Sequence, residues 1–413
     1  MVECANPEQA SVPLVGWSMA TAIARQTDAH IVTQIRNRDA FVRAGLKEGV
    51  DFTAIDTEAI SRPLWKFAEF LRGGSGVGWT IHTAISSLAY PYFESRVWKE
   101  FGTRIRSGEF DVVHRITPLT PTAASPIARK VEAAGIPFVL GPLNGGVPWP
   151  QGFDAERRKE REWLSHLRGV SRWLPAYRKT YRSASLVFCG SKFTQSDLPR
   201  RYAHKYRYEP ENGVDPTRFT HRCSAEPTQP LRLCFVGRLV PYKCPDLVLQ
   251  AAEKYLKAGT ARVDFIGDGP MMGDLKRWVA ERGLDASVTF HGWLPHQTVQ
   301  AVLALNNVLA FPSIREFGGG VVLEAMAVGL VPIVVDYAGP GELVEEAWGY
   351  KLPMGNRQDI ARNLEGLLGR LIADPAVLRE KAVAGMQRVA SEHAWDAKAA
   401  KIVKQYEALA RKT

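Results

Sequence analysis

Short apolar runs alternate with stretches of helical periodicity along nearly the whole chain. The apolar runs lie in the second half at 231–237, 263–267, 287–292, 307–313 and 331–336, and in the first half at 30–35, 51–56, 109–116, 137–142 and 185–190. Runs of this kind are typical of parallel strands that helices cover on both faces. The pattern therefore predicts an α/β protein with two doubly wound parallel sheets.

Turn-forming residues near the middle of the chain mark the boundary between the two sheets. Residues 209–219 contain two prolines and an Asn-Gly pair, which favour a connecting loop. We expect 1–208 to form an N-terminal domain, 209–219 to form a linker, and 220–387 to form a C-terminal domain. Only Met1 and Val2 precede a polar loop at the start, so the first sheet begins with a stub or the sequence lacks a few residues there.

Composition supports this organisation and indicates a cytoplasmic protein. The chain has 413 residues, 46% of them apolar. This length and apolar content are sufficient for two or three domains, each with its own core. It has no uncharged apolar run of about 18 residues and no basic-then-apolar leader. The five cysteines form no CxxC pair, so we expect reduced thiols and no structural metal.

Positive charge gathers in one region of the first half. The formal net charge is +10, and residues 157–207 carry 14 Lys or Arg against three acidic residues. Such a patch attracts nucleic acid, an anionic lipid surface or an anionic acceptor, but it is equally typical of a solvated surface. No nucleic-acid motif or basic tail accompanies the charge, so we do not expect a nucleic-acid partner.

Two aromatic segments allow either a core or an interfacial interpretation. Aromatic side chains crowd the region 62–108, and an apolar helical stripe runs through the basic region at Trp163, Leu167, Val170, Leu174, Tyr177 and Tyr181. Core packing explains both patterns. A surface for a lipid or aryl acceptor, or for peripheral contact with a bilayer, requires the same patterns.

The stretch 312–344 has the strongest chemical signal in the chain. Glu316 and Glu324 flank three consecutive glycines, Gly318–Gly320, that open a helix. Glycines let backbone amides approach a phosphate, and the unpaired amides of the helix N-terminus also favour anions. Glu316 could accept hydrogen bonds from a sugar, and Glu324 could accept both vicinal hydroxyls of a ribose.

A second cationic motif follows the strand at 231–237. Arg238 and Lys243 precede a helix that Pro245 begins, and a lysine at a helix N-terminus opposes the helix dipole. This placement is explained if an anion lies between the two cations and the amides. Such a group could neutralise a leaving diphosphate without a divalent ion.

Together these segments resemble the retaining glycosyltransferase family 4, which has the GT-B fold of two Rossmann-like domains facing across a cleft. The segments that resemble its donor-binding region are GRLVPYK at 237–243, FIGDGP at 265–270, FHGWLP at 290–295 and the Glu316–Glu324 pair, with ENGVDPTRF at 211–219 resembling its linker. Residues 110–126 and 137–150 are similar to the central motifs of its first domain. The terminal helix with Trp395 resembles one that crosses back, so we expect 388–413 to join the first domain.

The resemblance implies a role for each matching residue. Arg238 and Lys243 would hold the donor diphosphate, Glu316 the transferred sugar, and Glu324 the ribose. The remaining donor-binding residues would be Gly16, Gly237, Gly267, Gly269, Gly292, Trp293, Leu294, Phe317, Gly318, Gly319, Gly320 and Val321. His114 matches only the first histidine of the family's His-x-His, because the segment reads His114, Arg115, Ile116; Thr117 or backbone groups would replace the second histidine.

The resemblance implies a hexosyltransferase that retains the anomeric configuration. It would use a nucleotide diphosphate sugar, UDP-sugar rather than GDP-sugar, with no cofactor or metal. The acceptor would be a saccharide or a lipid-linked acceptor in cell-surface polysaccharide biosynthesis, and the protein would be cytoplasmic with peripheral contact to the inner face of the membrane. The alternative, motivated by the missing histidine, is a non-catalytic nucleotide-sugar sensor or scaffold.

Overall fold

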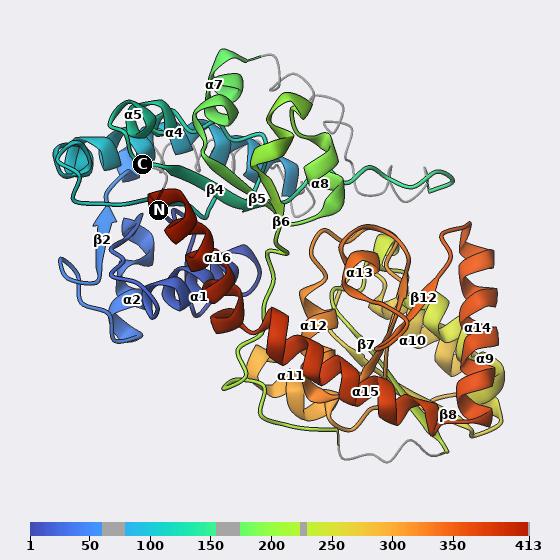
Figure 1. Cartoon of the computed structure of the whole chain (residues 1–413). Coiled ribbons are helices and arrows are strands. Elements are labelled where there is room, and N and C mark those ends of the chain that lie inside the picture. Colours follow the sequence, from blue (N-terminus) through green and yellow to red (C-terminus); the bar gives the residue numbers. More distant parts are fainter. Residues whose placement is uncertain (60–78, 154–173, 224–228, 412–413) are drawn as a thin grey trace. The chain divides into compact units, whose positions relative to one another are not determined.

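The computed structural model of the chain describes residues 1–59, 79–153, 174–223 and 229–411. These residues form two compact units (Figure 1). The first unit draws on Met1–Gly146, Glu160–Glu211 and Lys398–Thr413, and the second on Val147–Lys159 and Asn212–Ala397.

Two boundaries differ from the predicted ones. Residues 147–153 pack with the second unit, because Phe153 is buried in its core. The chain returns to the first unit only at Lys398, and not at 388. Before that point, the amide of Val214 donates to the carbonyl of His393 and the amide of Trp395 donates to the carbonyl of Val214, which ties this stretch to the second unit.

The first unit is built on parallel strands. Its elements in chain order are α1 (Val12–Ala24), β1 (Ile31–Gln34), η1 (Ile35–Asn37), α2 (Arg38–Arg43), β2 (Phe52–Ile55), α4 (Trp79–Arg106), β3 (Val113–Arg115), α5 (Ile127–Ala133), β4 (Phe138–Leu143), α7 (Pro175–Ser183), β5 (Leu186–Cys189), α8 (Lys192–Asp197), η3 (Arg200–Lys205), β6 (Tyr206–Tyr208) and most of α16 (Trp395–Ala410). One sheet has the order β3-β4-β5-β6, and β1 pairs with β2.

The residues Met1 and Val2 link these two sheets. The amide of Val2 donates to the carbonyl of Val32 in β1, and the amide of Ile116 beyond β3 donates to the carbonyl of Met1. Val2 also forms a parallel bridge with Thr117. Met1 and Val2 therefore occupy the place of a central strand between β1 and β3.

Three aromatic residues in the described part of 62–108 belong to the core. Tyr90, Phe93 and Phe101 on α4 are 2%, 1% and 4% exposed and pack against β4 and β5. On α7, Tyr177 and Tyr181 are buried in the same core, whereas Leu174 before the helix is 53% exposed. Core packing therefore explains these described members; Trp163, Leu167 and Val170 lie outside the described residues.

The second unit has a larger sheet. Its elements are β7 (Leu231–Val236), η4 (Pro241–Lys243), α9 (Pro245–Lys257), β8 (Ala261–Ile266), α10 (Met272–Glu281), β9 (Val288–Gly292), α11 (His296–Leu303), β10 (Val308–Phe311), α12 (Gly320–Val328), β11 (Val331–Val335), α13 (Ala338–Leu343), β12 (Tyr350–Leu352), α14 (Arg357–Ala373), α15 (Val377–Arg388) and η5 (Val389–His393). The parallel strands have the order β12-β11-β10-β7-β8-β9.

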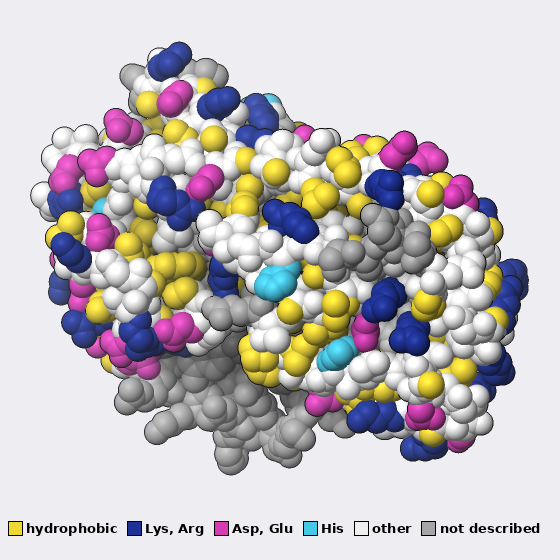
Figure 2. Space-filling model, turned by 90° about the horizontal axis from the view of Figure 1, so that it is seen from below, with side chains coloured by type: hydrophobic (Ala, Val, Ile, Leu, Met, Phe, Trp, Pro, Cys, Tyr) yellow, Lys and Arg dark blue, Asp and Glu magenta, His cyan; other side chains and the backbone are white. Residues whose placement is uncertain are grey.

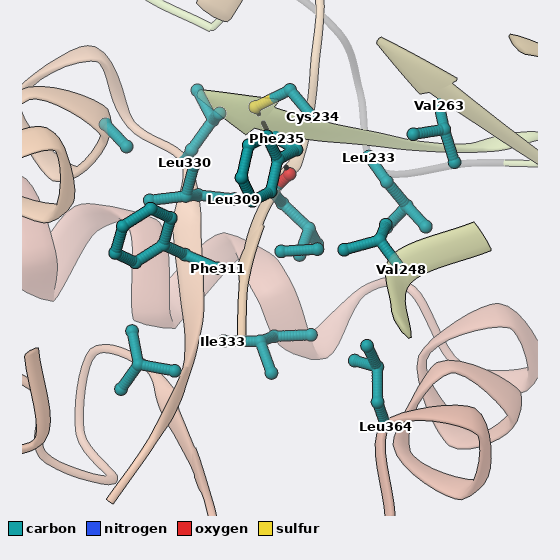
Figure 3. Close-up of a cluster of buried hydrophobic side chains, with 14 of the residues drawn as sticks. Leu233, Cys234, Phe235, Val248, Val263, Leu309, Phe311, Leu330, Ile333 and Leu364 are labelled. Atoms are coloured by element: carbon teal, nitrogen blue, oxygen red, sulfur yellow. Dashed lines mark hydrogen bonds between the residues drawn. The ribbon is translucent and has the colours of Figure 1, made fainter. Parts of the chain in front are cut away.

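Every residue of β10 and β11 is buried, as expected for central strands covered on both faces. Phe235 of β7 lies 5.9 Å, between ring centroids, from Phe311 of β10, and Figure 3 shows these rings among aliphatic side chains from neighbouring strands. Leu364 of α14 contributes to the same cluster (Figure 3). This core fixes the strand ends from which the candidate site projects.

Charged side chains of both signs are scattered over the face shown in Figure 2, among hydrophobic and other side chains. In the described part of the basic region, Arg178, Arg200 and Arg201 are exposed. None of the described helices is long and apolar enough to cross a bilayer. None of the five cysteines, all in described ranges, forms a disulfide.

Candidate functional site

The strand order of the second unit reverses between β7 and β10, which lie side by side. In doubly wound sheets, ligands bind beyond the carboxyl ends of the strands at this reversal. The loop after β7 carries Arg238 and Lys243, and the loop after β10 carries Glu316. Within this unit, the topology therefore brings these two loops together at the favoured position.

Lys243 and Glu316 form an ion pair, with 2.8 Å between Nζ of Lys243 and Oε2 of Glu316. Both side chains are mostly buried, at 16% and 22% exposure. Burial lowers the pKa of Lys243, but the Glu316 carboxylate outweighs it, so the net pKa is raised and the ammonium persists at neutral pH. The ammonium also lies 5.2 Å from the centroid of the Phe311 ring, which adds a cation–π contact.

Gly237 and Arg238 lie directly beside this pair. A Cβ on Gly237 would lie 3.3 Å from Nζ of Lys243, and Gly237 has a φ of +140°, which side chains rarely adopt. Arg238, the next residue, is exposed, and its guanidinium makes no hydrogen bond or ion pair to another described residue. Because Lys243 and Glu316 neutralise each other, Arg238 is the cation of this loop that remains uncompensated.

The glycine turn leads directly into α12. Gly319 has a φ of +60° and caps the helix in the left-handed conformation, and its Cβ would lie 3.1 Å from Cγ of Pro340. Gly320 begins the helix against the side chain of Asn212, which leaves little room for a larger residue. Glu324 lies one turn further on the same face and is partly buried. The helix N-terminus and both predicted carboxylates thus come from one short segment.

The glycines after β8 have a structural explanation. Gly267 has a φ of +131°, and its Cβ would collide with the carbonyl oxygen of Gly237 at 2.1 Å. A Cβ on Gly269 would lie 2.4 Å from the carbonyl oxygen of Leu239. These glycines let the loops after β7 and β8 pack backbone to backbone. Contacts within the chain therefore explain why glycine is needed at both positions.

The loop after β9 presents an aromatic side chain to solvent. Trp293 is 75% exposed, whereas Leu294 packs partly against the core. The amide of Gly267 donates to the carbonyl of Gly292 at 2.7 Å, so this loop is fixed to the one after β8. An exposed tryptophan on a fixed loop offers a flat apolar face for a ring system.

The remaining candidates, His114 and Gly16, belong to the first unit. The Nδ1 atom of His114 lies 2.5 Å from the Tyr406 hydroxyl, and Nε2 lies 2.7 Å from the carbonyl oxygen of Gly141. A carbonyl only accepts, so Nε2 carries the proton and Nδ1 accepts from the tyrosine. Desolvation lowers the pKa of His114 to about 3. Both nitrogens are engaged within the protein, which favours a structural role.

Gly16 and Thr117 also have partners within the first unit. A Cβ on Gly16 would lie 2.2 Å from the carbonyl oxygen of Cys4, so the close approach that requires glycine is made by the chain itself. Thr117 is fully buried, and its hydroxyl accepts from the amide of Cys4 at 3.0 Å. The proposed substitute for the missing histidine is thus already engaged.

Four residues that shape the site were not among the predicted ones: Trp149, Tyr242, Arg315 and Gly339. The amide of Gly339 donates to the carbonyl of Glu316 at 3.3 Å, and its Cβ would overlap the carbonyl of Phe317 at 2.2 Å. The sequence signal was the Ala-Gly-Pro-Gly run at 338–341, which packs against the loop carrying Glu316. Trp149 lies in the segment 137–150, which resembles a family motif, but nothing in the sequence associates it with Glu316.

In a comparison with known proteins, one family model matches part of the chain. Residues 216–378 match the family model of glycosyl transferases group 1. The chain is 30% identical over 218 residues to WcaL of Salmonella typhimurium, a protein assigned as a colanic acid biosynthesis glycosyltransferase; the match covers 49% of this chain and 51% of WcaL. It is 32% identical over 163 residues to the 2-deoxystreptamine glucosyltransferase of Streptomyces kanamyceticus, covering 38% and 40%. The chain spans about half the length of the curated relatives it matches.

Solved structures resemble the whole chain. Anabaena HepE, crystallised with UDP, matches with a TM-score of 0.64 at 15% identity over 97% of this chain and 98% of HepE. Sucrose-phosphate synthase of Thermosynechococcus elongatus matches with a TM-score of 0.60 at 16% identity over 100% and 96%. The predicted fold class is confirmed, because the chain has the GT-B fold. Residues 216–378 match the family model of glycosyl transferases group 1.

Proposed function

We propose that the protein is a retaining glycosyltransferase that transfers a hexose from a UDP-sugar to a hydroxyl of a saccharide or lipid-linked acceptor in cell-surface polysaccharide biosynthesis. The observation that carries the proposal is the Lys243–Glu316 pair at the reversal of strand order, next to the glycine-capped N-terminus of α12. Relatives named for colanic acid and amylovoran biosynthesis and a structural neighbour bound to UDP support the pathway and the donor.

Each residue then has a defined task. Arg238 and the amides at the start of α12 bind the diphosphate and stabilise its charge as the bond to the sugar breaks. Lys243 fixes the orientation of Glu316, which accepts hydrogen bonds from the transferred sugar. Glu324 accepts the ribose hydroxyls, and Trp293 packs against the base. Catalysis depends on positioning and charge stabilisation, with the leaving diphosphate assisting the acceptor on the same face.

A ligand panel tests the donor. Melting temperature is measured with UDP, GDP, ADP and their sugars, and we expect UDP and a UDP-sugar to raise it most, by the linkage of binding to stability. Arg238→Ala should abolish the increase, whereas Arg262→Ala, which alters an exposed arginine of β8, should preserve it. If no nucleotide raises the melting temperature of the wild-type protein, the proposal fails.

A turnover assay distinguishes the enzyme from a non-catalytic sensor. Slow hydrolysis of the donor, followed by release of UDP, should fall about a hundredfold in Glu316→Gln, because an interaction made to the reacting sugar is lost. Binding of UDP itself should change little. UDP binding without any hydrolysis or transfer in the wild-type protein would support the sensor. We expect hydrolysis to continue in EDTA, because Arg238 and the α12 amides supply the charge.

A further inference from the structure

A short segment that directly follows Gly146 is anchored in the second unit. Val147 and Phe153, near its ends, are 2% and 1% exposed, and Phe153 belongs to the core around β7 and β10. Between them, the hydroxyl of Tyr337 donates to the carbonyl of Pro148 at 2.9 Å. The segment 147–153 is therefore fixed where the loops after β7 and β10 meet.

Trp149 is the central contact of this segment. The guanidinium carbon of Arg315 lies 4.8 Å from the centroid of the Trp149 ring and 5.3 Å from that of Phe317, so the arginine contacts both rings. Arg315 is only 6% exposed. A desolvated cation–π contact of this kind is stronger than one at an exposed site. On its other side, Trp149 meets Tyr242 edge to face, with 6.3 Å between the centroids and 89° between the planes.

These contacts involve the chain neighbours of both members of the ion pair. Arg315 and Phe317 flank Glu316, and Tyr242 directly precedes Lys243. The amide of Ile314 also donates to the carbonyl of Tyr242 at 3.0 Å, which joins the two loops. A shift of the Trp149 ring would therefore be transmitted to both backbones that carry the pair.

We infer that Trp149 is a positioning residue for the Lys243–Glu316 pair: its ring fixes the loops after β7 and β10 and so sets the orientation of the Glu316 carboxylate. The consequence for turnover rests on the proposed function of that pair, whereas the effect on the loops does not. The ring of Trp149 contacts Arg315 and Tyr242, the chain neighbours of Glu316 and Lys243.

The chain offers a matched control in Trp278. It is also a partly buried tryptophan packed on the same core, and its ring lies 4.2 Å from the guanidinium carbon of Arg282. Trp278 is on the second half of α10, and its cation partner Arg282 belongs to neither the loop after β7 nor the loop after β10. Trp278→Ala therefore removes a similar contact without disturbing the ion pair. Trp149→Phe, which keeps an aromatic face for Arg315, serves as the conservative variant.

The first experiment is hydrogen exchange followed by mass spectrometry on the intact protein, without ligand. In Trp149→Ala, peptides covering 312–319 and 240–244 should exchange about tenfold faster than in the wild-type protein, because local opening requires less free energy. Trp149→Phe should restore most of the protection, and Trp278→Ala should leave these peptides unchanged. Equal exchange of these peptides in Trp149→Ala and the wild-type protein would overturn the inference.

The second experiment measures turnover and UDP affinity. We expect kcat to fall by about ten- to a hundredfold in Trp149→Ala because a small displacement of a positioned group has an effect of that size. The Kd for UDP should stay within about twofold, and in a Glu316→Gln background Trp149→Ala should cause little further loss. An undiminished kcat, or a full additional loss in that background, would contradict the inference. Protected loops in an inactive wild-type protein would instead refute the proposed function alone.

Discussion

Glycine has two different uses among the residues of this chain. At Gly319 it supplies a left-handed cap before α12, whereas at Gly16 and Gly267 it makes room for a backbone carbonyl of the same chain. The cap at Gly319 places the free amides of a helix N-terminus at the surface of the turn. The sequence alone does not distinguish a capping glycine from one that makes room for a carbonyl, because all three glycines lie in helical or loop segments.

A pair of glycine-to-alanine substitutions tests this explanation. Gly16→Ala should destabilise the protein by about 1–3 kcal/mol because its Cβ would lie 2.2 Å from the carbonyl oxygen of Cys4. Gly273→Ala on α10 is the control, since no atom lies within 4 Å of its Cβ position. Alanine there should stabilise the helix by up to about 1 kcal/mol. Urea unfolding measures both effects; equal stability of Gly16→Ala and the wild-type protein would refute the packing argument.

His114 should make stability depend on pH. Its pKa is lowered from 6.5 to about 3 by desolvation, so between these values the unfolded chain binds a proton that the folded protein does not. The free energy of unfolding should therefore decrease as the pH falls below about 6.5, by about 1.4 kcal/mol per pH unit from this residue. Above that pH, His114 should not affect how the free energy of unfolding depends on pH.

The comparison uses His114→Gln at pH 7.5 and pH 5. Other groups titrate in both proteins, so the difference between the two declines isolates the histidine. The wild-type protein should lose about 2 kcal/mol more than the variant over this interval. Parallel declines would mean that His114 is protonated equally in the folded and unfolded states, against the enclosed geometry described above.

Among the elements, α16 is fixed in the first unit by a buried ion pair. Lys398 is fully buried, and its ammonium donates to Glu209 and, at 2.5 Å, to the carbonyl of Pro210. Burial lowers the pKa of Lys398, and Glu209 opposes that shift. The residue therefore fixes the helix to the chain segment that leaves β6.

Removing one member of the Lys398–Glu209 ion pair should destabilise the protein more than removing both. Lys398→Met should destabilise the protein by about 3–5 kcal/mol because it leaves the Glu209 carboxylate buried and uncompensated. The double variant Lys398→Met, Glu209→Gln should recover more than about 1 kcal/mol of that loss. Thermal and urea unfolding of the two variants measure the difference. A double variant that is no more stable than Lys398→Met would show that the two residues are not coupled.

The sequence predicted the elements whose strands are long and apolar. β7, β8, β10 and β11 follow runs that could only be central strands, and the glycine turn before α12 was evident from its letters. The short strands β6 and β12 were missed, because sequences such as Tyr-Arg-Tyr and Tyr-Lys-Leu resemble ordinary surface loops. Their pairing arises from the neighbouring strands, so tertiary structure and not local propensity determines them.

The candidate site was predictable to the extent that its residues lie close together in sequence. Glu316, Glu324 and the glycines form one motif, and Lys243 stands out as a cation at a helix N-terminus. The contact of Trp149 with Arg315 joins residues 166 positions apart (315 − 149), and no periodicity indicates it. His114 seemed available in sequence, because the partners of its ring, Gly141 and Tyr406, lie far along the chain.

At the scale of the whole molecule, exposed arginines gather around a cavity in the first unit. In the first unit, a cavity of about 500 Å³ is lined by Tyr177, Arg178, Asp197, Pro199, Arg200 and Arg201. Three arginines against one aspartate leave it positive, which suits an anionic headgroup or a lipid diphosphate. We therefore propose peripheral binding to an anionic membrane surface through this part of the first unit.

Vesicle sedimentation tests this proposal. The wild-type protein should sediment with vesicles containing phosphatidylglycerol and remain in solution with phosphatidylcholine alone, and salt at about 0.5 M should release it by screening. Changing Arg178, Arg200 and Arg201 to Glu should abolish sedimentation. The control changes Arg262, Lys276 and Arg277, all exposed in the second unit, to Glu, which alters the net charge equally. If both triple variants bind equally well or equally poorly, net charge and not this cavity determines the association.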